Sequence, residues 1–88
     1  MLKYEIEYSD DFCDKYFSKL PKNMKERIVA FIEQRISVDP FHCGECLKGK
    51  LSGLMRARCG DYRIVYLILE DKIVIQIVKI NHRKDVYL

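Results

Sequence analysis

The chain has 88 residues, of which 49% are hydrophobic and 33% charged; this composition suits one small globular domain and excludes a disordered chain. No apolar run approaches the roughly 20 residues needed to cross a bilayer, and residues 1–11 lack the apolar core of a signal peptide, so we expect a cytoplasmic protein with no membrane partner. The net charge of +3 is uneven, because residues 1–46 carry 7 Lys/Arg against 9 Asp/Glu and residues 47–88 carry 9 against 4. The basic second half suits a polyanionic partner, although a solvated basic face would produce the same counts.

The first part of the chain predicts one strand followed by a helix. Residues 2–8 alternate apolar and charged side chains, which is typical of a half-buried strand. Ser9 then offers an N-cap, and the two aspartates after it suit the positive end of a helix dipole. An apolar stripe at a spacing of four follows, made of Phe12, Tyr16 and Leu20.

A second helix is predicted over residues 22–38, directly after Pro21. Its apolar side chains share one face: Met24, Ile28, Phe31, Ile32 and Ile36. Two helices with so tight a join form an αα-hairpin. The second helix ends at Asp39, because the residue before a proline is driven out of the helical region.

The second half predicts a loop and a small sheet. Residues 41–53 contain three glycines and are expected to form a loop. Three strands follow, at Leu54–Cys59, Tyr62–Leu69 and residues 73–80, and Gly60 favours a type II′ turn between the first two. The expected fold is therefore α+β, in the order β-α-α-β-β-β, with two N-terminal helices packed on a small antiparallel sheet in a single domain over residues 1–88.

The turn between the first two of these strands makes a geometric prediction. If Gly60 and Asp61 form the turn, Arg58 lies directly opposite Arg63, and Arg56 shares their face of the sheet because side chains alternate along a strand. Opposed like charges destabilise a strand pair, whereas a phosphate-binding surface uses them, since guanidinium groups match phosphate oxygens. The alternative is that these arginines splay into solvent or pair with acidic side chains.

The polar tail after the last predicted strand contributes further candidates, namely His82, Arg83, Lys84 and Tyr87. An antiparallel last strand returns to the end of the sheet that holds Arg63, so the tail could reach the arginine patch. Tyr87 is equally compatible with a plain hydrophobic anchor.

Residues 39–87 combine several short motifs in a fixed order: DPF, LKGKLSGL, an R-x-R pair, GDYRIVY and HRKDVY. This ordered combination resembles the RelE/ParE toxin superfamily, and the resemblance covers nearly the whole chain. Resemblance to RelE implies a microbial ribonuclease-like fold and a type II toxin that cleaves mRNA in the ribosomal A site without a cofactor. Its implied partners are a RelB-like antitoxin, the ribosome and mRNA.

The resemblance also assigns residues. Arg56 and Arg58 occupy the places of two basic residues that are often lysines in the family, so the charge is kept but the capacity for proton transfer is not. Arg63 matches the arginine of the family's G-x-Y-R strand, while Arg83 and Tyr87 match its C-terminal arginine and tyrosine. The expected catalytic set is Arg56, Arg63, Arg83, Tyr87 and His82, and the expected RNA-binding set is Lys48, Lys50, Arg58 and Lys84.

The expected reaction is attack of a ribose 2′-hydroxyl on the adjacent phosphorus, which expels the 5′-oxygen and leaves a 2′,3′-cyclic phosphate. Arg56, Arg63 and Arg83 would stabilise the charge that gathers on the phosphoryl oxygens, and the scheme requires no metal. Arginine is a poor base at neutral pH. The base is therefore either Tyr87, whose ionised form nearby cations favour, or His82, since some family members use a histidine.

Two other functions remain open from the sequence. The sister branch, ParE, has the same scaffold and inhibits DNA gyrase, but it generally lacks the full catalytic set, so the presence of Arg83 and Tyr87 favours the ribonuclease branch. The third possibility is a noncatalytic domain that binds nucleic acid or protein.

The cysteines raise a separate question. Cys43 and Cys46 form a C-x-x-C pair that could supply half a zinc site, but the chain holds no second such pair. Further ligands would have to come from His42, His82, Cys13 or Cys59. In a reducing cytoplasm we expect all four cysteines to remain thiols and no metal to be bound.

Overall fold

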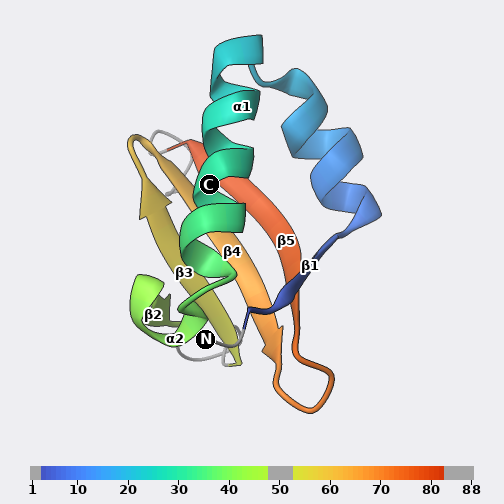
Figure 1. Ribbon diagram of the computed structural model, residues 1–88. Coiled ribbons are helices and arrows are strands. Elements are labelled where there is room, and N and C mark those ends of the chain that lie inside the picture. Colours follow the sequence, from blue (N-terminus) through green and yellow to red (C-terminus); the bar gives the residue numbers. More distant parts are fainter. Residues whose placement is uncertain (1–2, 48–52, 83–88) are drawn as a thin grey trace.

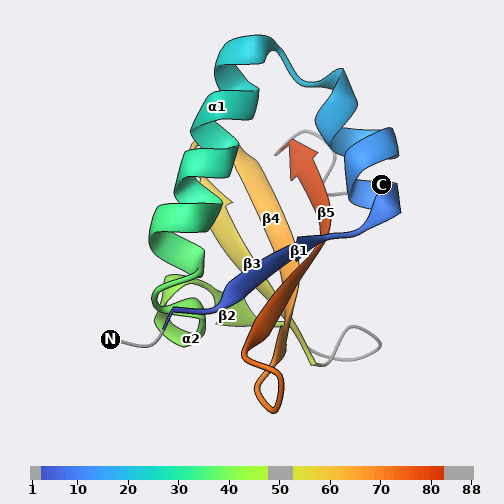
Figure 2. The ribbon, with the colours of Figure 1, turned by 45° about the vertical axis from the view of Figure 1, so that its right-hand side comes forward.

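The computed structural model describes residues 3–47 and 53–82 and shows helices packed on one face of a twisted sheet (Figure 1, Figure 2). The helical segments are η1 (Phe12–Tyr16, π-helical), η2 (Phe17–Lys19, 3₁₀), α1 (Lys22–Phe31), η3 (Ile32–Ile36, π-helical) and α2 (Pro40–Cys43). The strands are β1 (Glu5–Tyr8), β2 (Glu45–Cys46), β3 (Leu54–Cys59), β4 (Tyr62–Leu69) and β5 (Val74–His82). Within the described residues they form one sheet in the order β1-β5-β4-β3-β2. The predicted α+β class is confirmed.

The sheet is mixed, whereas the sequence predicted an antiparallel one. Strands β3, β4 and β5 form an antiparallel meander, but β1 pairs with β5 in parallel, from Glu5 opposite Val74 to Tyr8 opposite Ile77. An alternating pattern predicts a strand without fixing its partner or direction. The direction of β1 follows from the helices, which carry the chain back across one face of the sheet before β3 begins. Strand β1 then occupies the outer edge beside β5 and runs parallel to it.

The segment from residue 41 to 53 is not wholly a loop. Helix α2 begins at Pro40, which suits a first helical turn because its missing N–H would be unpaired there, and β2 then pairs with β3. The hydroxyl of the fully buried Tyr66 donates a hydrogen bond to the Pro40 carbonyl at 2.7 Å and fixes α2 to the sheet. The glycine-based loop prediction was wrong here because tertiary contacts stabilise these short elements.

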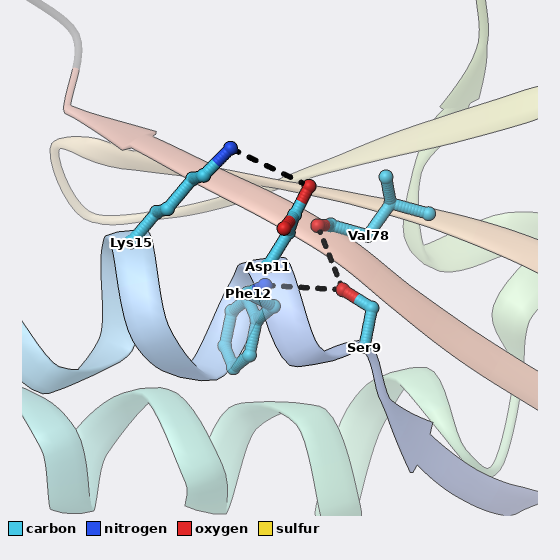
Figure 3. Close-up of polar contacts among 5 residues, drawn as sticks. All are labelled: Ser9, Asp11, Phe12, Lys15 and Val78. Atoms are coloured by element: carbon cyan, nitrogen blue, oxygen red, sulfur yellow. Dashed lines mark hydrogen bonds and ion pairs between the residues drawn. The ribbon is translucent and has the colours of Figure 1, made fainter.

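The predicted N-cap at Ser9 is confirmed (Figure 3). The Ser9 hydroxyl accepts the backbone N–H of Phe12 at 3.1 Å and donates to the carbonyl of Val78 at 3.2 Å. One side chain thus starts the first helical segment and ties it to β5. The helical stripe ends earlier than predicted, because Leu20 has an extended backbone after η2.

The core lies between the helices and the sheet. Ile28, Ile32 and Ile36 are fully buried at successive turns, as the apolar face predicted, and they cluster with buried side chains of β3, β4 and β5. Alternate residues of β3, including the buried Ala57, point into this core, so their neighbours must point to the opposite, open face of the sheet.

Candidate functional site

Arginines gather on the open face at one end of the sheet. Arg58 lies opposite Arg63 and Arg56 lies opposite Val65, so the predicted register of β3 and β4 is confirmed. Gly60 has a φ of 60°, as the first position of a type II′ turn requires. Because Arg58 and Arg63 are directly opposed, their guanidinium groups reach the same small area of surface.

These arginines border a pocket of about 290 Å³, lined by Cys43, Gly44, Glu45, Arg56, Arg58 and Arg63. One wall is the arginine-bearing hairpin, and the other is the segment that joins α2 to β2. Its three arginines match a phosphate-bearing ligand, because guanidinium groups bind phosphate oxygens through paired N–H donors.

Glu45 is the site residue that sequence reasoning missed. Its carboxylate Oε1 accepts a hydrogen bond from Arg56 Nη2 at 2.7 Å across the β2–β3 pair. This hydrogen bond and the charge of Arg56 lower the pKa of Glu45, with further lowering from Arg58 and Arg63. The pocket therefore contains an ionised acceptor among cations. No local signal identifies Glu45, because its place depends on pairing with a strand that lies 11 residues further along the chain.

A close backbone approach positions Glu45. A Cβ atom on Gly44 would lie 2.5 Å from the Arg56 carbonyl oxygen and 2.8 Å from the Tyr66 hydroxyl, so only glycine fits. Burial raises the pKa of the Tyr66 hydroxyl above its usual range, which keeps its proton available for the Pro40 carbonyl. Gly44 and Tyr66 together hold Glu45 against Arg56.

His82 lies on the other face of the sheet. It pairs with Tyr62 across β4 and β5, and the two rings meet edge to face with centroids 5.1 Å apart. Because neighbouring residues of a strand face opposite sides, Tyr62 and His82 point away from the face of Arg63. The last strand does return to the end that holds Arg63, as predicted, but the expectation that His82 shares the arginine patch is wrong.

The remaining predicted site residues lie outside the described part of the chain. They are Lys48, Lys50, Arg83, Lys84 and Tyr87. Their assignment to the site stays a prediction from the resemblance.

The four cysteines, Cys13, Cys43, Cys46 and Cys59, are free in the structure. Burial raises the pKa of the Cys43 thiol, while the Sγ of Cys46 lies 3.4 Å from the Sδ of Met55. Across residues 3–47 and 53–82, no three His, Cys, Asp or Glu side chains gather as a metal site would require. Over the same ranges, no helix has the length and apolarity needed to cross a membrane.

Comparison with known proteins identifies the family. The model described as "ParE toxin of type II toxin-antitoxin system, parDE" matches residues 6–87. Toxin RelG and Toxin RelE of Mycobacterium tuberculosis are each 33% identical to this chain over 69 residues, which span 78% of it and 79% and 71% of the two relatives. The chain belongs to the RelE/ParE toxin superfamily. It is thus a toxin of the type II toxin–antitoxin class, with RelE homologues.

Solved RelE/ParE structures share the fold. The chain superposes on the M. tuberculosis RelBE2 toxin–antitoxin complex with a TM-score of 0.90 and 28% identity over 97% of each chain. The archaeal RelE–RelB complex from Pyrococcus horikoshii gives a TM-score of 0.72 and 27% identity over 96% of this chain and 99% of that one. The RelE/ParE scaffold therefore positions the arginine pocket described above.

Proposed function

We propose that this RelE/ParE toxin is an endoribonuclease that cleaves mRNA in the ribosomal A site, acts in the cytoplasm and is neutralised by a RelB-like antitoxin. The observation that carries the proposal is the pocket of about 290 Å³ in which three arginines and one carboxylate converge on the open face of the sheet. RelE-named relatives and RelB-containing neighbours support the ribonuclease branch and the antitoxin partner.

In this proposal the reacting phosphate enters the arginine pocket. Arg56 and Arg63 stabilise the charge on the phosphoryl oxygens, and Arg58, which is more exposed, holds a neighbouring phosphate. The incoming phosphate competes with Glu45 for Arg56. The reaction draws its electrostatic stabilisation from guanidinium groups and needs no metal.

A base must take the proton of the attacking 2′-hydroxyl while the 5′-oxygen leaves and is protonated. The resemblance makes Tyr87 the first candidate for this base and makes Arg83 a further cation beside the phosphate. The geometry adds Glu45 as a second candidate, because its carboxylate lies within the pocket. The neighbouring arginines lower its pKa and so weaken it as a base, and the incoming phosphate must first displace it from Arg56. His82 is not proposed for this role, since it faces the opposite side of the sheet.

Cleavage of message on purified ribosomes, followed by primer extension, tests the proposal. Arg63→Ala should cut at least about 100-fold more slowly than wild type, the usual effect of losing one preorganised group at an oxyanion. Tyr87→Phe should also cut at least about 100-fold more slowly, the usual effect of losing a general base. Lys72→Ala is the matched control, because it removes one exposed positive charge in the β4–β5 turn, away from the pocket. Wild-type rates in both test variants would refute these roles.

Inhibition of DNA gyrase is the second candidate, and the match to the ParE toxin model favours it. A supercoiling assay with purified gyrase separates the two functions. The ribonuclease proposal predicts cuts within translated codons and normal supercoiling by gyrase. The gyrase alternative predicts inhibited supercoiling and an uncut message.

A further inference from the structure

A second cationic pocket lies behind the arginine pocket, on the helix side of the sheet. It has a volume of about 270 Å³, and its lining includes Lys15, Tyr16, Lys19, Tyr62 and His82. The lysines come from η1 and η2, one helical turn apart, and the other side chains add aromatic surface. Lysines beside aromatic rings are the side chains with which proteins bind single-stranded nucleic acid, since lysine attracts phosphate and any base can stack on a ring.

The two pockets lie at the same end of the sheet. Tyr62 and Arg63 are consecutive in β4 and face opposite sides, and their partners in β5 are His82 and Asn81. The turn at Gly60 separates the two faces, and the first helical segment and the end of β5 both lie near this end of the sheet (Figure 1, Figure 2).

Another cation covers the turn between the pockets. The Arg27 guanidinium, carried by α1, comes so near Gly60 that a Cβ atom there would lie 3.3 Å from its Nη2. A cation therefore lies at this turn as well as in each pocket, although the turn also carries the exposed carboxylate of Asp61. A polyanionic strand that passes from one pocket to the other would meet Arg27 at the turn.

The lysines of this pocket are available to a ligand. Lys15 Nζ lies 3.7 Å from Asp11 Oδ2, and both side chains are mostly exposed (Figure 3). Such a long surface pair is weak and easily exchanged for a phosphate. Lys19 is also exposed, whereas Tyr62 is half-buried and its ring is held in place by the edge-to-face contact with His82.

We propose that this second pocket is an RNA subsite, which holds a nucleotide of the cleaved strand that lies several nucleotides away from the scissile phosphate. The phosphate lies on Lys15 and Lys19, and the base packs on the aromatic surface of Tyr16 and Tyr62. The inference rests on the proposed ribonuclease function and extends it, because it adds a contact that sets the minimum length of tightly bound RNA.

The test measures binding of single-stranded RNA with methylated 2′-hydroxyls, which cannot be cleaved, to the full chain. The variant is Lys15→Ala/Lys19→Ala, and the matched control combines Lys72→Ala with Lys3→Ala, which also removes two exposed lysines. The decanucleotide should bind the test variant roughly tenfold more weakly than the wild type, whereas the control variant should bind it as the wild type does. The slope of log Kd against log salt should fall by about 0.7 in the test variant, the value for the one single-strand phosphate that the two lysines hold. A trinucleotide, which fills only the arginine pocket, should bind all forms equally.

A second measurement locates the contact. A decanucleotide with 4-thiouridine at one end should cross-link on irradiation to the peptide that contains Tyr16 or Tyr62. Equal binding of the decanucleotide to wild type and test variant, or cross-links confined to β3, would overturn the subsite while the ribonuclease proposal stands. If the wild type binds neither RNA, the subsite is overturned, while the ribonuclease proposal is decided separately by cleavage on purified ribosomes.

Discussion

The contact between Gly44 and β3 allows a sharp prediction for Gly44→Ala. The backbone of Gly44 is extended, with φ −136° and ψ −168°, so alanine can adopt it without strain. The cost is steric, because the new Cβ would lie 2.5 Å from the Arg56 carbonyl oxygen. Ordinary contact begins at 3.4 Å, so the segment that carries Glu45 must retreat by about 0.9 Å.

The magnitude follows from that displacement. If Glu45 moves with Gly44, its hydrogen bond to Arg56 lengthens from 2.7 Å to about 3.6 Å, which is no longer a hydrogen bond. Overpacking of this kind typically costs about 1–3 kcal/mol, and each kcal/mol lowers the Tm of a domain of this size by roughly 4–8 °C. The pKa of Glu45 should rise towards its ordinary value of about 4.3 once Arg56 withdraws.

Thermal unfolding measures the first effect, and carbon-13 NMR titration of the Glu45 carboxyl measures the second. Gly53→Ala is the control, because Gly53 has a φ of 96° with no atom within 4 Å of an added Cβ. Alanine there costs stability through backbone strain and leaves the pKa of Glu45 low. An unchanged pKa in Gly44→Ala would refute the view that this glycine positions Glu45.

Four further predictions follow from the same structure. Tyr66→Phe leaves the buried Pro40 carbonyl without its donor and should cost about 1–3 kcal/mol in urea unfolding; a loss within error would contradict the anchoring role. Because the pKa of Glu45 is lower in the folded than in the unfolded state, its ionised form adds stability above about pH 4.3 that is lost as the pH falls through the folded pKa. The loss of unfolding free energy caused by Glu45→Gln should therefore shrink in acid, and a loss independent of pH would contradict the pairing of Glu45 with Arg56. Iodoacetamide should alkylate the exposed Cys13 before Cys43, whose pKa burial raises, as peptide mass spectrometry would show; the opposite order would contradict the placement of Cys43. Ile32→Ala empties a fully buried position and should cost about 2–5 kcal/mol in urea unfolding, so a loss below 1 kcal/mol would disprove its place in the core.

Local sequence determined the features that depend on neighbours in the chain. The turn at Gly60 fixed the β3–β4 register and therefore brought Arg58 opposite Arg63. The spacing of Ile28, Ile32 and Ile36 fixed the buried face of the second helix, and Ser9 fixed the start of the first. Each of these rests on backbone geometry over a few residues, which repeats wherever the same pattern occurs.

Only the tertiary structure decided the features that depend on segments far apart in the chain. The parallel pairing of β1, the pairing of Glu45 with Arg56 and the face on which His82 lies all depend on which strand is the neighbour. The face on which His82 lies depends on the exact register of β5, because side chains alternate along a strand. A shift of one residue would move His82 from one side of the sheet to the other. The sequence therefore determined that arginines would gather, and the packing of distant elements decided that a carboxylate rather than a histidine would join them.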